Sequence, residues 1–191
     1  MGIDEAIIRY GTAAVLEYGK MSGIEAENVI PEKCLVVFMA SRLIDELRWC
    51  AKREVSNTVM LKELGHQGDP DLIGDLGGYH TDIAIYDGVT PKAIIEVKKV
   101  LSKSDIGCVK RDMEKLQKFT KRVSVPSYLG LLISDNYPTL IDRQLELLKE
   151  ALDHEVLTDA GARHKDYRTG QWSWRFGCVT LNPPSDRCHL D

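Results

Sequence analysis

The sequence predicts a single α/β domain in which helices cover both faces of a mixed sheet. Near the middle of the chain, residues 81–99 contain two short runs rich in Ile and Val, joined by an Asp-Gly turn signal. Segments with helical periodicity lie before and after them. The chain has 191 residues, of which 43% are hydrophobic and 28% charged, as in ordinary globular proteins. We therefore expect one domain over residues 1–191, with an N-terminal helical segment of about residues 1–30.

The segments before the hairpin are assigned from their caps and periodicity. Residues 4–20 are expected to form a helix with Asp4 as its N-cap. A second helix should begin at Pro31 and run to Leu47, because proline is favoured at the first helical position. The β-branched residues within 52–62 predict a first core strand, and the glycines of 65–80 predict a long loop.

The hairpin of residues 81–99 places charged residues on one face. If residues 87–91 form the loop and Tyr86 faces Lys92, then Asp82 lies opposite Glu96. The two-residue period of a strand puts Lys98 on the same face. The other face carries only apolar residues, namely Ile83, Ile85, Ala93, Ile95 and Val97. Ala84 and Ile94 keep the charged face partly apolar, which is typical of strands covered on both sides.

The remaining segments complete the expected sheet. A helix over about residues 105–120, a buried strand over 127–136 and a helix over 142–154 should follow. Residues 171–181 alternate like an edge strand or a hairpin. This order fits a mixed sheet with helices on both faces.

Two carboxylates on a buried face predict a metal site. Burying one unpaired charge costs on the order of several kcal/mol, unless the charge is paired or bound to a cation. Oxygen ligands suit Mg²⁺ or Mn²⁺, and Lys98 would add a positive charge beside Asp82 and Glu96. The alternative is a solvated salt bridge between Glu96 and Lys98.

Asp82 and the Glu96-Val97-Lys98 triplet resemble the motif of the PD-(D/E)xK nuclease superfamily, which has the restriction-endonuclease-like fold. The resemblance implies magnesium-dependent hydrolysis of phosphodiester bonds, with Asp82 and Glu96 holding Mg²⁺ or Mn²⁺ and Lys98 beside the attacking water. Thr81 stands where the family motif has proline.

The resemblance also implies an auxiliary metal ligand in the helix before the sheet. Glu32, followed by Lys-Cys-Leu-Val, matches the family pattern, and Glu46 of the same helix competes with it. The two lie about 21 Å apart along a helix, so they cannot reach one metal together. Glu32 is favoured, although a first-turn Glu also stabilises the helix dipole.

Basic residues are concentrated in one segment of an acidic chain. The net charge is −4, whereas residues 92–122 contain ten Lys or Arg against four Asp or Glu. That segment is +6 and the remainder is −10. The predicted helix presents a basic stripe of Arg111, Lys115, Lys118 and Arg122, opposite Val109, Met113 and Leu116. This stripe and Lys99 are the candidate nucleic-acid contacts, and a solvated face is the alternative reading.

The sequence therefore predicts a metal-dependent nuclease that acts on DNA, or alternatively on RNA. The other hypotheses are a catalytically inactive module of the same fold that binds nucleic acid or a protein partner, and a plain α/β scaffold. Five cysteines without a Cys-x-x-Cys pair favour a reducing cytoplasmic setting. No membrane partner is expected, and self-association as a homodimer is left open.

Overall fold

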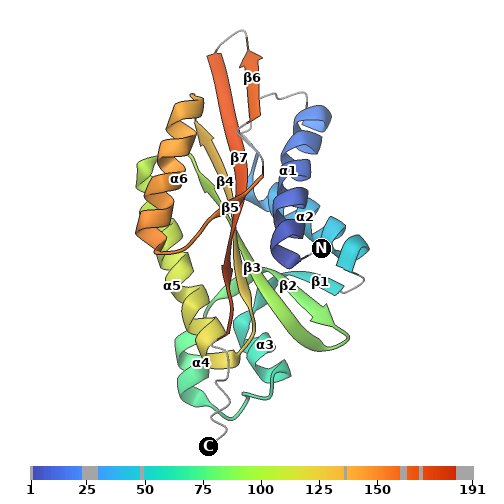
Figure 1. The fold of residues 1–191 in the computed structure, drawn as a ribbon. Helices are drawn as coiled ribbons and strands as arrows, with labels where there is room; N and C mark the ends of the chain where they lie inside the picture. The colour runs from blue at the N-terminus through green and yellow to red at the C-terminus, as the bar shows by residue number, and fades with distance from the viewer. Residues whose placement is uncertain are drawn as a thin grey trace, which may run out of the picture.

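The computed structural model describes residues 2–22, 30–47, 50–135, 137–159, 163–167 and 170–183. Within these residues the protein is α/β: a mixed seven-stranded sheet is covered by helices on both faces, as the sequence predicts (Figure 1). The helices are α1 (Ile3–Ser22), α2 (Glu32–Leu47), α3 (Asn57–Glu63), α4 (Pro70–Leu76), α5 (Ile106–Val123) and α6 (Pro138–Leu152), with a short 3-10 turn, η2 (Lys103–Asp105), before α5. The strands are β1 (Cys50–Ser56), β2 (His80–Asp87), β3 (Thr90–Val100), β4 (Ser127–Asp135), β5 (Leu157–Thr158), β6 (Arg163–Tyr167) and β7 (Gly170–Leu181).

The strand order is β1-β2-β3-β4-β7-β5, and β6 pairs with β7. Among the described strands only the β3–β4 pair is parallel, and the connection between these strands runs through α5. A parallel pair requires a crossover of this kind, because a tight turn cannot join two strands that run in the same direction. The crossover brings α5 directly beside the strand that carries Glu96 and Lys98.

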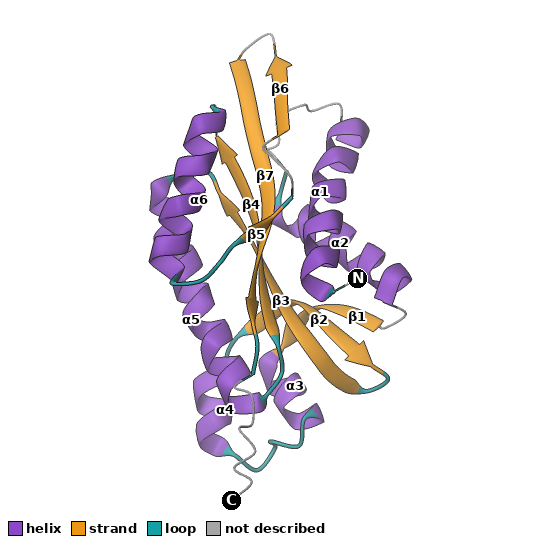
Figure 2. Cartoon of the chain, viewed as in Figure 1, coloured by secondary structure: helices purple, strands orange, loops and turns teal. Residues whose placement is uncertain are grey.

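Helices lie against both faces of the sheet (Figure 2), and each face has its own hydrophobic core. On one face α1 and α2 pack against Ile83, Ile85, Ile95 and Val97. Gly11 allows α1 to approach β7 closely, because an added Cβ there would collide with the ring of Phe176. On the other face α3, α4, α5 and α6 cover a second core.

The predicted hairpin register is confirmed in its central part. Ile83 faces Ile95 and Ile85 faces Ala93, so Asp82 and Glu96 occupy the next opposed positions. The turn is tighter than expected, because Asp87 pairs directly with Thr90 and only Gly88 and Val89 lie between them. A register shift between Ile85 and Tyr86 accommodates the shorter loop.

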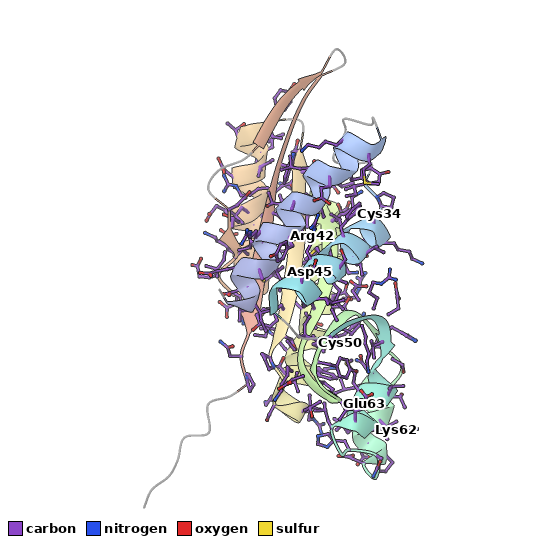
Figure 3. All side chains as sticks on the ribbon, turned by 90° about the vertical axis from the view of Figure 1, so that its right-hand side faces the viewer. Cys34, Arg42, Asp45, Cys50, Lys62 and Glu63 are labelled. Carbon is purple, nitrogen blue, oxygen red and sulfur yellow. The ribbon has the colours of Figure 1, made fainter. Side chains whose placement is uncertain are left out.

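The expected strand over residues 52–62 is wrong in its second half, since the strand ends at Ser56 and α3 begins at Asn57. The hydroxyl of Tyr86 donates a hydrogen bond of 2.7 Å to Glu63 Oε2, which fastens α3 to the sheet. Figure 3 shows that Lys62 and Glu63 lie on α3, which is separate from the helix α2 that carries Arg42 and Asp45.

The expected loop over residues 65–80 is also partly wrong, because it contains α4 and the first residue of β2. Asp69 caps this helix by accepting a hydrogen bond of 2.9 Å from the Leu72 amide. The C-terminal strand β7 forms a hairpin with β6 as one alternative predicted, but it is not an edge strand there, since β4 pairs with its other side.

None of the helices in the described ranges is long and apolar enough to cross a bilayer. The described cysteines, Cys34, Cys50, Cys108 and Cys178, are free thiols.

Candidate functional site

The candidate site lies where β2 and β3 separate. β2 and β3 are paired as far as Ile83 and Ile95, whereas β3 remains paired with β4 as far as Val100. At the point of separation, Asp82 Oδ2 accepts a hydrogen bond of 2.8 Å from the Val97 amide. The Asp82 carboxylate thus accepts from a backbone donor of β3, which holds the carboxylate beside Glu96.

Glu96 is the most strongly perturbed acid of the site. Burial is the main cause, and the charge and hydrogen bond of Asp82 add to it, so that the pKa of Glu96 rises to about 9. The nearby ammonium of Lys98 acts in the opposite direction but does not cancel these effects. At neutral pH, without a cation, the Glu96 carboxyl group is therefore protonated.

Lys98 is held by carboxylates from two helices. Its Nζ lies 3.0 Å from Glu32 Oε1, at the start of α2, and 3.8 Å from Asp112 Oδ2, on α5. Burial disfavours the charged ammonium, but the neighbouring carboxylates, first of all Glu32 and Asp82, outweigh burial and raise the pKa of Lys98. Lys98 is therefore a fixed, protonated donor at neutral pH.

The structure brings four predicted residues together, since Glu32 reaches Lys98 while Asp82 and Glu96 meet each other. Glu32 is on the first turn of α2, and Glu46 is in its last turn, with a side chain outside the described residues. Glu32 contacts Lys98, whereas the sequence predicted that Glu32 binds a metal ion. Within the described residues, no group of three His, Cys, Asp or Glu side chains is arranged to hold a metal.

Sequence reasoning missed Asp112 and Tyr79. Asp112 binds Lys115 Nζ through Oδ1 at 2.7 Å and faces Lys98 through Oδ2. Lys115 Nζ in turn lies 4.9 Å from the centroid of the Tyr79 ring. Asp112 follows Val109 by three positions and precedes Leu116 by four, so helical periodicity could have placed it beside the buried face of α5.

These residues surround a cavity of about 300 Å³ between β2, β3 and α5. Its polar lining includes Asn57, Asp82, Glu96, Lys98, Asp112 and Lys115. The volume is at the lower end of the range found for small-ligand sites. Charged groups thus converge on an enclosed space rather than on a flat, solvated surface.

The other predicted nucleic-acid contacts lie outside this cavity. Lys99 is on the opposite face of β3, and its Nζ donates a hydrogen bond of 2.8 Å to the Ile30 carbonyl. Arg111 and Lys118 are exposed on α5. Arg122 is also exposed, and it lies 3.5 Å from Asp75. Of the basic stripe, only Lys115 lines the cavity.

The donor set fits a hard divalent cation. Asp82 and Glu96 supply carboxylate oxygens, and the raised pKa of Glu96 indicates that a positive charge, either a proton or a cation, is needed between them. Mg²⁺ commonly binds through one or two carboxylates and keeps several waters. Asp82 and Glu96 are thus the residues that would hold such an ion.

Comparison with known proteins gives no match: no family model fits the chain, and no curated protein or solved structure is significantly similar to it.

Proposed function

We propose that this protein is a metal-dependent nuclease that hydrolyses phosphodiester bonds of DNA. The observation that carries the proposal is the convergence of Asp82, Glu96 and Lys98 in a partly enclosed cavity. Two adjacent carboxyl groups, one of them buried with a raised pKa, and a half-buried charged lysine are costly to keep together for stability alone. Such perturbed groups cluster at functional sites.

Each residue has a role that follows from its contacts. Asp82 and Glu96 would hold Mg²⁺ or Mn²⁺, which, when bound, would supply positive charge to the phosphodiester oxygens. Lys98 would donate hydrogen bonds to the phosphate or to the attacking water, because its raised pKa makes it a poor proton acceptor. Glu32 and Asp112 position the Lys98 ammonium at 3.0 and 3.8 Å. If Glu32 is an auxiliary metal ligand, its carboxylate would have to leave Lys98 when the ion binds.

The first test is cleavage of labelled DNA in Mg²⁺ or Mn²⁺ by Asp82→Asn and Lys98→Ala. Each change should lower the cleavage rate by roughly 100-fold or more, the loss typical when one electrostatic catalytic group is removed. Asn retains an oxygen that can accept the Val97 amide, so Asp82→Asn should keep its fold. The matched control is Asp87→Asn at the exposed end of the same strand, which should cleave like the wild type.

The second test separates the enzyme from an inactive module of the same architecture. Calorimetry with Mn²⁺ should show a site in the wild type that Asp82→Asn weakens. Binding of DNA without any cleavage, and without Mn²⁺ binding, would favour the inactive module. Cleavage that persists at the wild-type rate in Asp82→Asn would contradict the proposed site.

A further inference from the structure

The cavity beside the carboxylate pair has a buried inner wall and an exposed mouth. Tyr79 is 40% exposed and lies at the mouth, together with Lys115 from α5. The Lys115 ammonium, 4.9 Å from the Tyr79 ring centroid, connects the loop before β2 to α5 across this opening. An aromatic ring and a cation thus lie in the part of the cavity lining that is exposed to solvent.

The inner wall combines apolar surface with one polar pair. Phe119, Leu116 and Ile94 are buried and line the cavity. Thr81 Oγ1 donates a hydrogen bond of 2.9 Å to Asn57 Oδ1, in a pair that is almost fully buried. Within the described residues the Asn57 side chain makes no other hydrogen bond, so its NH₂ group can donate to an acceptor on a ligand. The apolar side chains of this wall can lie against a planar heterocycle, while the Asn57 amide and the charged groups of the cavity meet its polar parts.

The recessed position of the charged groups disfavours a duplex. The side chains of Lys98 and Asp112 are only 21% and 17% exposed, and they lie behind the Tyr79 and Lys115 mouth. A phosphate in a base-paired strand cannot enter a cavity of about 300 Å³ together with its paired base. Enzymes that modify a base meet the same problem of access, and they act on single strands or extrude one nucleotide from the stack.

The net charge of the protein also disfavours duplex DNA as a substrate. Outside residues 92–122 the chain carries a net charge of −10, which repels the dense phosphate charge of duplex DNA. A single strand has a lower charge density and offers unstacked bases, so stacking on an aromatic ring can supply affinity that phosphate contacts do not.

We propose that this cavity takes one unpaired nucleotide and that the substrate is single-stranded DNA. The base lies against Tyr79 and the apolar wall, the Asn57 amide meets its edge, and Lys115 contacts the phosphate that approaches Asp82. This inference rests on the proposed function, since it names the substrate class of the same site.

The experiment measures DNA binding in EDTA, so that its result does not depend on hydrolysis. Three fluorescent probes of equal length are compared by anisotropy: an oligo-dT strand, the same strand with its bases removed, and a blunt duplex. The oligo-dT strand should bind at least about tenfold more tightly than either of the others, since stacking on one aromatic ring contributes at this level.

Three variants test the role of the ring. Tyr79→Ala should weaken oligo-dT binding about tenfold and hardly change binding of the strand without bases. Tyr79→Phe should retain the wild-type affinity, because it keeps the stacking surface. Tyr137→Ala is the matched control, since Tyr137 is an exposed tyrosine next to α6 and does not line the cavity. Thermal unfolding of each variant reports whether it is folded.

The outcomes separate this inference from the nuclease proposal. Oligo-dT binding that depends on Tyr79, without any metal-dependent cleavage, would retain the single-strand site and reject the nuclease. Cleavage that depends on Asp82, with equal binding of duplex and oligo-dT or with full oligo-dT binding in Tyr79→Ala, would overturn the single-strand inference and retain the nuclease.

Discussion

The two faces of the β2–β3 hairpin differ in role, since one face packs under helices and the other carries the candidate site. Residues with odd numbers, such as Ile83, Ile95 and Val97, form a continuous apolar surface under α1 and α2. Residues with even numbers place Asp82 and Glu96 beside a cavity that α5 covers. Because successive side chains alternate between faces, a shift of one residue in register would exchange core and site.

The comparison shows that one face fixes the geometry of the other. The apolar face has few acceptable registers, since any slip would expose its isoleucines and bury charges. The charged face also packs Ala84 and Ile94 into the second core, and Asp82 and Glu96 remain opposed because their neighbours in sequence are held in place. The difference between the faces should therefore be visible in both stability and pH dependence.

The largest effect is expected on the apolar face. Ile95→Ala removes a fully buried side chain and should lower the free energy of unfolding by about 2 to 5 kcal/mol, as large-to-small changes in cores do. Urea unfolding measures this change. Val89→Ala in the exposed turn should alter stability by no more than about 0.5 kcal/mol. A loss below about 1 kcal/mol for Ile95→Ala would mean that this face is not tightly packed.

A pH-dependent effect, opposite in sign at high pH, is expected on the charged face. The pKa of Glu96 is raised in the folded protein, to about 9 from 4.5, so the folded state binds a proton that the unfolded state has released. The resulting stabilisation is complete below about pH 4.5 and is lost as pH rises toward 9. The melting temperature of the metal-free protein should therefore fall between pH 6 and pH 9.

Glu96→Gln tests this pH dependence. Gln cannot ionise, so the variant should lose most of the fall in melting temperature and exceed the wild type at pH 9. Glu114→Gln, on the exposed part of α5, is the control and should keep the wild-type pH profile. An unchanged profile in Glu96→Gln would show that another group causes the dependence. Added Mn²⁺ should stabilise the wild type most at high pH, where Glu96 is ionised.

The smallest effect on stability is expected on the outer surface of α5. Arg111→Gln combined with Lys118→Gln should change the free energy of unfolding by no more than about 0.5 kcal/mol. If these residues contact phosphates, the slope of log affinity against log salt should fall by roughly 1.8 for duplex DNA or 1.4 for single strands. Salt titrations of the double variant measure this slope.

The control for the basic stripe lies on the opposite face of the sheet. Lys20→Gln combined with Lys33→Gln removes two exposed charges from α1 and α2 and should leave the salt slope nearly unchanged. Equal slopes for both double variants would identify the α5 stripe as an ordinary solvated surface.

The sequence predicted the central part of the hairpin register, because two strand-forming runs flank one clear turn signal. It missed the shift next to the turn, where Tyr86 pairs with Pro91 instead of the expected Lys92. It failed between Asn57 and Tyr79, where two short helices were assigned to a strand and a loop. Thr58 and Val59 suggested a strand, although Met60, Leu61 and Leu64 keep helical spacing. Tertiary packing of these residues overrides the weak local preference for a strand.

The second error came from treating Pro70 and the nearby glycines only as loop signals. Asp69 followed by Pro70 is equally a helix start, with an N-cap acceptor and a proline in the first turn. Asp112 was missed for a different reason. Helical spacing could place Asp112 beside the buried face of α5, but only the crossover from β3 to β4 brings it to Lys98.

The position of β7 in the sheet has a consequence for synthesis of the chain. β4 has nine residues, eight of them buried, and it is hydrogen-bonded to β3 on one edge and to β7 on the other. The ribosome releases β4 well before residues 170–181, so a nascent chain presents a long hydrophobic edge that awaits its last neighbour. Such edges are templates for pairing between chains. A chain interrupted before Gly170 should therefore self-associate, and β7 is the strand that protects newly made protein from aggregation.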